Sequence, residues 1–159
     1  MIHKSITTSL LISLFLLFGT SLTLGFDENG IPEPGDIVAE ISAKLNPATI
    51  RPVENIRLEA TLNMVPGWHV YSVIPQGEDA PPPSDLRVAD TQFVPDGPVY
   101  ETRPVNDFDK VIGLNLSYHK NKAVFYRNFK IPTETQTGKN KLEVTVHFQT
   151  CSDKICLPP

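Results

Sequence analysis

The sequence predicts an all-β fold, a sandwich or barrel built from short strands. Apolar and polar residues alternate in several segments with a period of two and not 3.6. Clusters of turn-forming residues separate these segments, and no stretch has the pattern of a convincing amphipathic helix. The chain has 159 residues, 40% of them hydrophobic and 20% charged, which suits one globular domain.

Five segments carry the strand pattern, in the order 37–45, 55–64, 67–73, 123–131 and 141–150. The second, NIRLEATLNM, alternates Ile, Leu, Ala and Leu with Arg, Glu and Thr. The last, KLEVTVHFQT, shows the clearest alternation. The turn-forming clusters between segments include NPATIRP, MVPG and TETQTGKN. In the third segment, GWHVYSV, we expect Trp68 in the core and His69 and Tyr71 on the opposite face.

Two long loops are expected, at 74–85 and 95–122. The first, IPQGEDAPPPSD, is rich in proline and should be stiff. The second is longer than a plain connection between strands needs to be. Because long loops on a β scaffold often carry function, both are candidate parts of a functional site.

The first 25 residues have the layout of a secretory signal peptide. Lys4 supplies a positive charge, an apolar run follows at 10–18, and small residues come after it. The run is shorter than the ~20 residues that span a bilayer, and an uncleaved membrane anchor is the alternative. We expect a signal peptide at 1–25, a flexible lead-in at 26–36, and one β-sandwich domain at 37–159 with no further membrane span.

Charge and compartment follow from this interpretation. Removal of the signal peptide would take away Lys4 only, so the formal net charge would go from −4 to −5. A mildly acidic domain has no electrostatic reason to bind nucleic acid, and we expect no nucleic-acid partner. In an exported protein, two cysteines can form a disulfide.

Both cysteines, Cys151 and Cys156, lie in the C-terminal segment FQTCSDKICLPP. On one straight strand their Cα atoms would be ~16 Å apart, whereas a disulfide needs ~4.4–6.8 Å. Ser152 and Asp153 are good turn residues, so the simplest arrangement is a tight hairpin with the cysteines facing each other. Such a bond would close a six-residue ring, worth roughly 2 kcal/mol, and this small value weakly favours chemistry over structural support.

The alternation also predicts where Cys151 points. If no bulge intervenes, Cys151 lies on the polar face of the last strand, within reach of solvent or of a loop, as reactive thiols need to be. His147 shares that face, and His69 or His119 could approach, so a metal site is one alternative. The spacing is not the common C-x2-C of zinc sites. An inert disulfide, a metal site and a redox dithiol all stay open at this point.

FQTCSDKICLPP resembles the active-site segment of the N-terminal periplasmic domain of the thiol:disulfide interchange protein DsbD. In that family a strand ends in Cys, a short turn follows, and a second Cys precedes an apolar or aromatic residue and two prolines. PGWHVYS, at 66–72, is similar to the family's strand of Gly, aromatic, two residues and Tyr. The order and separation of the two segments match as well, and the similarity covers 37–159.

The resemblance implies an immunoglobulin-like β-sandwich with a long cap loop and a C-terminal active-site hairpin. It assigns Cys151 and Cys156 as a reversible disulfide, with His69 and Tyr71 nearby. The cap segment matches NDFDKVIG, at 106–113. The supporting or cap residues in this segment are Phe108, Asp109 and Val111; Val111 stands where the family has its aromatic cap. We expect the apolar side chains of Phe108, Val111 and Ile112 to lie over the Cys151–Cys156 hairpin.

The family's function gives the expected partners. Such domains receive electrons from a membrane-embedded donor through a thioredoxin-like domain, and pass them to periplasmic disulfide isomerases or cytochrome-maturation thiol proteins. We therefore expect an exported thiol–disulfide oxidoreductase that needs an external electron donor, with no cofactor and no metal. The alternatives are a non-catalytic β-sandwich interaction module with a structural disulfide and, third, a metal carrier.

Overall fold

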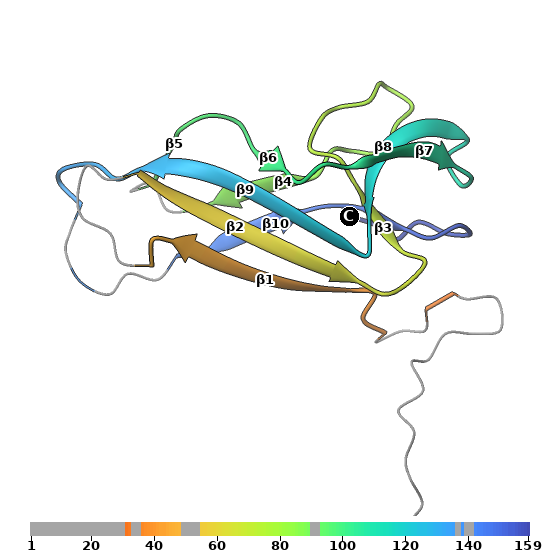
Figure 1. The fold of residues 1–159 in the computed structure, drawn as a ribbon, viewed down its shortest axis with the longest axis horizontal. Coiled ribbons are helices and arrows are strands. Elements are labelled where there is room, and N and C mark those ends of the chain that lie inside the picture. Colours follow the sequence, from red (N-terminus) through yellow and green to blue (C-terminus); the bar gives the residue numbers. More distant parts are fainter. Residues whose placement is uncertain (1–30, 33–35, 49–54, 90–92, 136–137, 139–141) are drawn as a thin grey trace, which may run out of the picture.

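The computed structural model describes residues 31–32, 36–48, 55–89, 93–135, 138 and 142–159 (Figure 1). These residues form strands and no helix, so the all-β prediction is confirmed. The strands pair in antiparallel fashion and pack as a sandwich. The immunoglobulin-like detail stays a prediction. In the described part of the chain, no helix is long and apolar enough to cross a membrane.

The first sheet has the order β1-β2-β9, and both β5 and β6 pair with β9. Its strands are β1 (Ala39–Asn46), β2 (Asn55–Met64), β5 (Val94–Pro95), β6 (Tyr100–Glu101) and β9 (Lys122–Lys130). β2 has the clearest alternation, because every second residue from Ile56 to Met64 is buried. Its bounds are those predicted from the sequence.

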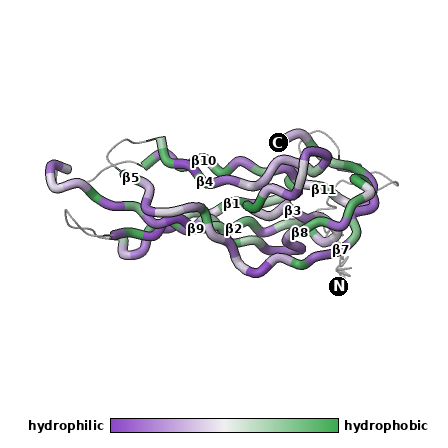
Figure 2. The backbone as a smooth tube through the Cα atoms, turned by 90° about the horizontal axis from the view of Figure 1, so that it is seen from above, coloured by the Kyte–Doolittle hydropathy of each residue, from purple (hydrophilic) through white to green (hydrophobic). Residues whose placement is uncertain are grey.

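The remaining strands form a pair and a second sheet (Figure 2). The pair joins β10 (Val144–His147) to β4 (Asp85–Val88). The second sheet has the order β11-β3-β8-β7. Its strands are β11 (Thr150–Cys151), β3 (His69–Tyr71), β8 (Leu114–Lys120) and β7 (Val105–Asp109).

The core lies between these layers in three apolar clusters. Trp68 is 4% exposed and packs with Leu62 and Phe125, so the prediction that it is a core residue is confirmed. A second cluster joins β2 and β9 to β4 and β10. The third cluster contains Cys151 and Tyr71 and is the base of the candidate site.

The structure corrects three sequence predictions. The predicted loop at 95–122 contains the whole hairpin β7–β8, whose turn places Gly113 at φ 79°. The predicted strand at 141–150 is two strands, because the chain leaves β4 after β10 and joins β3 at β11. The predicted strand at 67–73 is shorter, since only His69–Tyr71 pairs with β8. The Pro-rich segment stays a loop up to Asp85, as expected.

Candidate functional site

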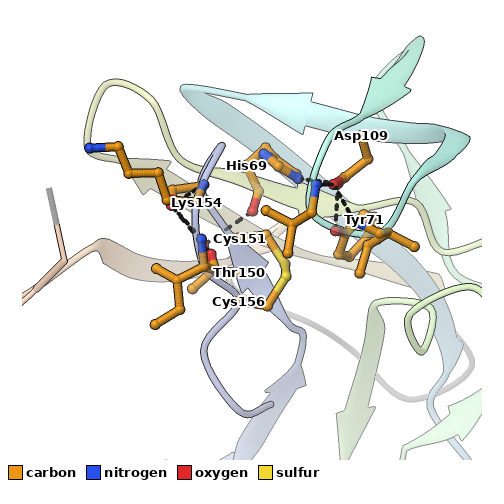
Figure 3. Close-up of a disulfide and its surroundings, with 11 residues drawn as sticks. His69, Tyr71, Asp109, Thr150, Cys151, Lys154 and Cys156 are labelled. Atoms are coloured by element: carbon orange, nitrogen blue, oxygen red, sulfur yellow. Dashed lines mark hydrogen bonds and ion pairs between the residues drawn. A yellow bond between two sulfur atoms is a disulfide. The ribbon is translucent and has the colours of Figure 1, made fainter. Parts of the chain in front are cut away.

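The site is built on the C-terminal hairpin. Cys151 and Cys156 are bonded to each other, and their Cα atoms are 4.0 Å apart (Figure 3). The Ser152 N–H donates to the Ile155 carbonyl oxygen over 2.8 Å, and the Leu157 N–H donates to that of Thr150 over 2.9 Å. The predicted tight hairpin is therefore confirmed, with the cysteines directly opposite each other.

Two polar side chains fix this hairpin. The Ser152 hydroxyl accepts from the backbone N–H groups of Lys154 and Ile155, both over 3.2 Å. This arrangement explains why a serine at the start of the turn favours it. The Thr150 hydroxyl donates to the His69 carbonyl oxygen over 3.1 Å and ties β11 to β3.

The two sulfur-bearing residues differ in burial. Cys151 is 0% exposed and packs with Tyr71, Leu116 and Tyr118, whereas Cys156 is only partly buried. Cys151 was predicted to lie within reach of solvent or of a loop; it is not within reach of solvent, but Ile112 of the β7–β8 turn packs on its cluster. The alternation of inward and outward side chains ends where β10 ends, because β10 pairs with β4 whereas β11 pairs with β3. The pattern of β10 therefore does not predict which way Cys151 points.

One buried carboxylate connects the β7–β8 turn to β3. Asp109, at the end of β7, is 3% exposed. Its Oδ2 accepts from the Tyr71 hydroxyl over 2.7 Å and lies 2.9 Å from the His69 Nε2 (Figure 3). Its Oδ1 accepts from the N–H groups of Val111 and Ile112, over 2.9 and 3.0 Å. Asp109 therefore shapes the turn and holds it against the strand that pairs with β11.

The protonation states follow from these contacts. Burial opposes ionisation of Asp109, but the hydrogen bonds from Ile112, Tyr71 and His69 outweigh it and hold its pKa below the ordinary value. Burial and the bond to Asp109 raise the pKa of Tyr71. Burial lowers the pKa of His69 despite the carboxylate beside it. At neutral pH, Asp109 is therefore an anion and His69 is a neutral donor through Nε2–H.

Of the three apolar residues expected over the cysteine hairpin, Phe108 and Val111 lie differently from the prediction. Phe108 is 54% exposed and Val111 is 37% exposed, and neither belongs to the cluster around Cys151. Phe108 points outward because its neighbour Asp109 points inward on β7. Ile112 is the residue of this segment that packs on the cluster. Its position agrees with the expectation from the apolar centre of NDFDKVIG, and its N–H donates to the carboxylate of Asp109, three residues earlier.

An exposed ion pair joins the two turns. The Lys110 Nζ lies 2.8 Å from the Asp153 Oδ2, which connects the β7–β8 turn to the turn of the cysteine hairpin. Both side chains are about two-thirds exposed, at 67% and 70%. The pair raises the pKa of Lys110 and lowers that of Asp153. Sequence reasoning did not foresee this contact, because 43 residues separate the partners.

A pocket of about 520 Å³ lies beside the cysteine hairpin. Trp68, His69 and Tyr118 form part of its wall, and Ser152 and Asp153 form another part. The pocket therefore borders Ser152, the residue that follows Cys151, and it is large enough to hold several side chains.

The other two candidate metal ligands, His119 and His147, lie on different strands, β8 and β10. His119 Nε2 lies 2.8 Å from Glu101 Oε2, inside the sandwich. His147 is exposed on β10, opposite Asp85. Within the described ranges, no three His, Cys, Asp or Glu side chains gather to hold a metal ion.

Comparison with known proteins gives one match. The family model described as the N-terminal part of the thiol:disulfide interchange protein DsbD matches residues 36–159. No curated protein and no solved structure matches the chain significantly. The match covers all the described strands, including both cysteines.

Proposed function

The chain belongs to the family of the DsbD N-terminal domain, and from this premise we propose that Cys151–Cys156 is a redox-active disulfide that serves periplasmic proteins. The family has a role in thiol–disulfide exchange and its domain is periplasmic. Export through a signal peptide at 1–25 is part of the proposal; these residues lie outside those that the structure describes.

The observation that carries the proposal is the placement of the disulfide. It joins residues five apart that the hairpin already brings together. Such a small ring adds only roughly 2 kcal/mol of support. The bond also lies beside a turn that the Asp109 carboxylate, the packing of Ile112 and the exposed Lys110–Asp153 ion pair hold in place. A disulfide between residues close in sequence, covered by a separate turn, suits regulated redox chemistry better than support of the fold.

Burial favours Cys156 as the sulfur that a partner reaches first. A thiolate of the electron donor attacks the Cys156 sulfur, a mixed disulfide forms, and the Cys151 sulfur leaves as a thiolate that takes up a proton. The donor's second thiolate then attacks the donor sulfur of the mixed disulfide and releases the Cys156 thiolate. Two electrons have moved, and the donor is now a disulfide.

The reduced protein runs the same steps toward its acceptor. The Cys156 thiolate attacks the acceptor disulfide, and one acceptor sulfur leaves. Cys151 then loses its proton and attacks the Cys156 sulfur, which restores the Cys151–Cys156 bond; the second acceptor sulfur leaves as a thiolate and takes up that proton. We propose a thioredoxin-like domain, supplied by a membrane electron donor, as reductant, and disulfide isomerases or cytochrome-maturation thiol proteins as acceptors.

The cap residues act before the chemistry. A docked partner must displace Ile112 and the turn that Asp109 shapes, while His69 and Tyr71 stay on β3 and hold the cover when no partner is present. Shielding of this kind limits exchange with the wrong thiols in an oxidising compartment. The pocket beside Ser152 and Asp153 gives the partner chain a place next to the disulfide.

The reduction potential of the purified protein tests the proposal. A value near those of exchange proteins, between about −120 and −270 mV, supports it, whereas a value below about −300 mV indicates the structural disulfide of an interaction module. Stoichiometric metal in the purified protein would favour a metal carrier instead. Trapping gives a second test: Cys151→Ser should accumulate a mixed disulfide through Cys156 with an acceptor, and Cys156→Ser should not.

A further inference from the structure

Strand β1 forms an open edge of the sandwich. Among the residues that the structure describes, its strand neighbour is β2, and its other side faces no strand (Figure 1). The strand is eight residues long. An edge of this length presents a row of backbone donors and acceptors to another chain unless something blunts it.

The side chains of β1 leave this edge accessible. The five residues from Glu40 to Lys44 are all exposed. Ile41 is 49% exposed, although it pairs with Leu62, which is 0% exposed on β2. Ala39 and Leu45, near the two ends of the inward face, pack on the core, whereas its centre around Ile41 carries apolar surface in contact with water.

The sequence of β1 is complementary to itself in an antiparallel arrangement. With Ser42 opposite Ser42 of a second copy, Glu40 stands opposite Lys44, on the face that points away from the core. On the other face, Ile41 stands opposite Ala43, and Ala39 opposite Leu45. Opposite charges and apolar pairs across neighbouring strands both stabilise a sheet.

We propose that β1 pairs with β1 of a second copy, in this register, to give a symmetric dimer with one continuous sheet. A two-fold axis through Ser42 makes the contact isologous, so it closes at two copies. Shifting the centre to Ile41 or Ala43 preserves the two faces but places Glu40 and Lys44 opposite uncharged residues. A shift of the pairing by one residue would put the apolar positions of one copy on the polar face of the other.

The dimer leaves the redox site free. β1 belongs to the first sheet, and the disulfide and its cover belong to the sheet that contains β3, β7, β8 and β11. Figure 1 places β1 along the opposite side of the molecule from β7 and β8. The proposal is therefore independent of the proposed function, and two domains could exchange electrons with partners at the same time.

Charge reversal tests the register. We would compare the wild type, Glu40→Lys and Lys44→Glu by sedimentation velocity from about 1 to about 500 μM, because an interface of one strand pair is smaller than that of stable complexes. The wild type should dimerise within this range. Each variant alone places like charges opposite each other twice, and its dimerisation should weaken at least about tenfold.

Mixing the two variants gives the decisive result. A Glu40→Lys copy and a Lys44→Glu copy restore two opposite-charge pairs, so an equimolar mixture should associate at least as well as the wild type. Glu78→Lys, at an exposed loop position, makes the same charge change as Glu40→Lys and should dimerise like the wild type. A monomeric wild type at about 500 μM, a mixture no stronger than its components, or an equal loss in Glu78→Lys would overturn the proposal.

Discussion

Replacing Asp109 by Asn should uncover the disulfide without unfolding the domain. The amide has nearly the same shape as the carboxylate, and its oxygen can still accept from the N–H groups of Val111 and Ile112. The negative charge that Tyr71 and His69 face is lost. The substitution therefore weakens the contacts between the β7–β8 turn and β3 while the turn itself can form.

The size of the effect follows from these two contacts. A hydrogen bond to a charged group contributes about 1.5–3 kcal/mol, and one between neutral groups about 0.5–1.5 kcal/mol. Two bonds that each lose about 1 kcal/mol shift the opening equilibrium by about 2 kcal/mol, which is about 30-fold. Tyr71→Phe removes one hydrogen bond to the charged carboxylate entirely, which is worth about 1.5–3 kcal/mol, and should therefore speed opening by about tenfold to about 100-fold.

The assay is the rate at which an uncharged phosphine reduces the disulfide at pH 7. An uncharged reductant is needed because removal of a carboxylate would also speed the approach of an anionic thiolate. Ile56→Val, in the core cluster of β2 and β9, should cost about 0.5–1.5 kcal/mol of stability without touching the cover. An unchanged rate in a folded Asp109→Asn protein, or an equal increase in Ile56→Val, would refute the reasoning.

Three further predictions concern the cover and its pH dependence. Ile112→Ala should speed reduction by the same phosphine about tenfold, because burial of such a side chain is worth about 1.5–3 kcal/mol. Phe108→Ala should change the rate less than about twofold. A larger effect of Phe108→Ala than of Ile112→Ala would contradict the assignment of Ile112 as the cover. Lys110→Ala should raise the rate of reduction less than about threefold, because exposed ion pairs are weak. It should also abolish the dependence of this rate on salt, because salt screens such a pair. A rate that still changes with NaCl in this variant would count against a role for the Lys110–Asp153 pair. The pKa of folded His69 lies below 6.5, so the unfolded chain binds more protons and stability should fall as the pH drops below about 6.5. His69→Gln, which keeps an N–H donor, should flatten denaturant-measured stability in this window, and His147→Gln should not.

The parts of the fold that could be predicted depend on local patterns. β2 alternates over ten residues, and its predicted bounds are those of the structure. The hairpin between Cys151 and Cys156 followed from chain geometry and from Ser152 at its turn. Trp68 was predicted to lie in the core from its place in the alternating pattern of GWHVYSV, and it packs there between the layers. In each case the structure depends either on contacts between residues close in sequence or on the alternation of a strand that has one buried face.

The parts that could not be predicted depend on partners far away in the chain. β7 has four exposed residues of five, and it forms because it pairs with β8. Cys151 is buried because β11 joins β3, which is about 80 residues earlier in the sequence. The inward position of Asp109 becomes visible only when His69 and Tyr71 are placed beside it. Periodicity carries no information on such contacts.

The packing of Ile112 on the cluster that contains Cys151 has a thermodynamic consequence. If reduction of the disulfide changes the free energy of opening the cover, then opening must change the free energy of reduction by the same amount, because the two form a closed cycle. A protein that binds with the cover open would thus shift the reduction potential while it is bound. For a two-electron couple, about 1.4 kcal/mol corresponds to about 30 mV. The difference in reduction potential that drives exchange is then a property of each complex, so it can differ from one partner protein to the next.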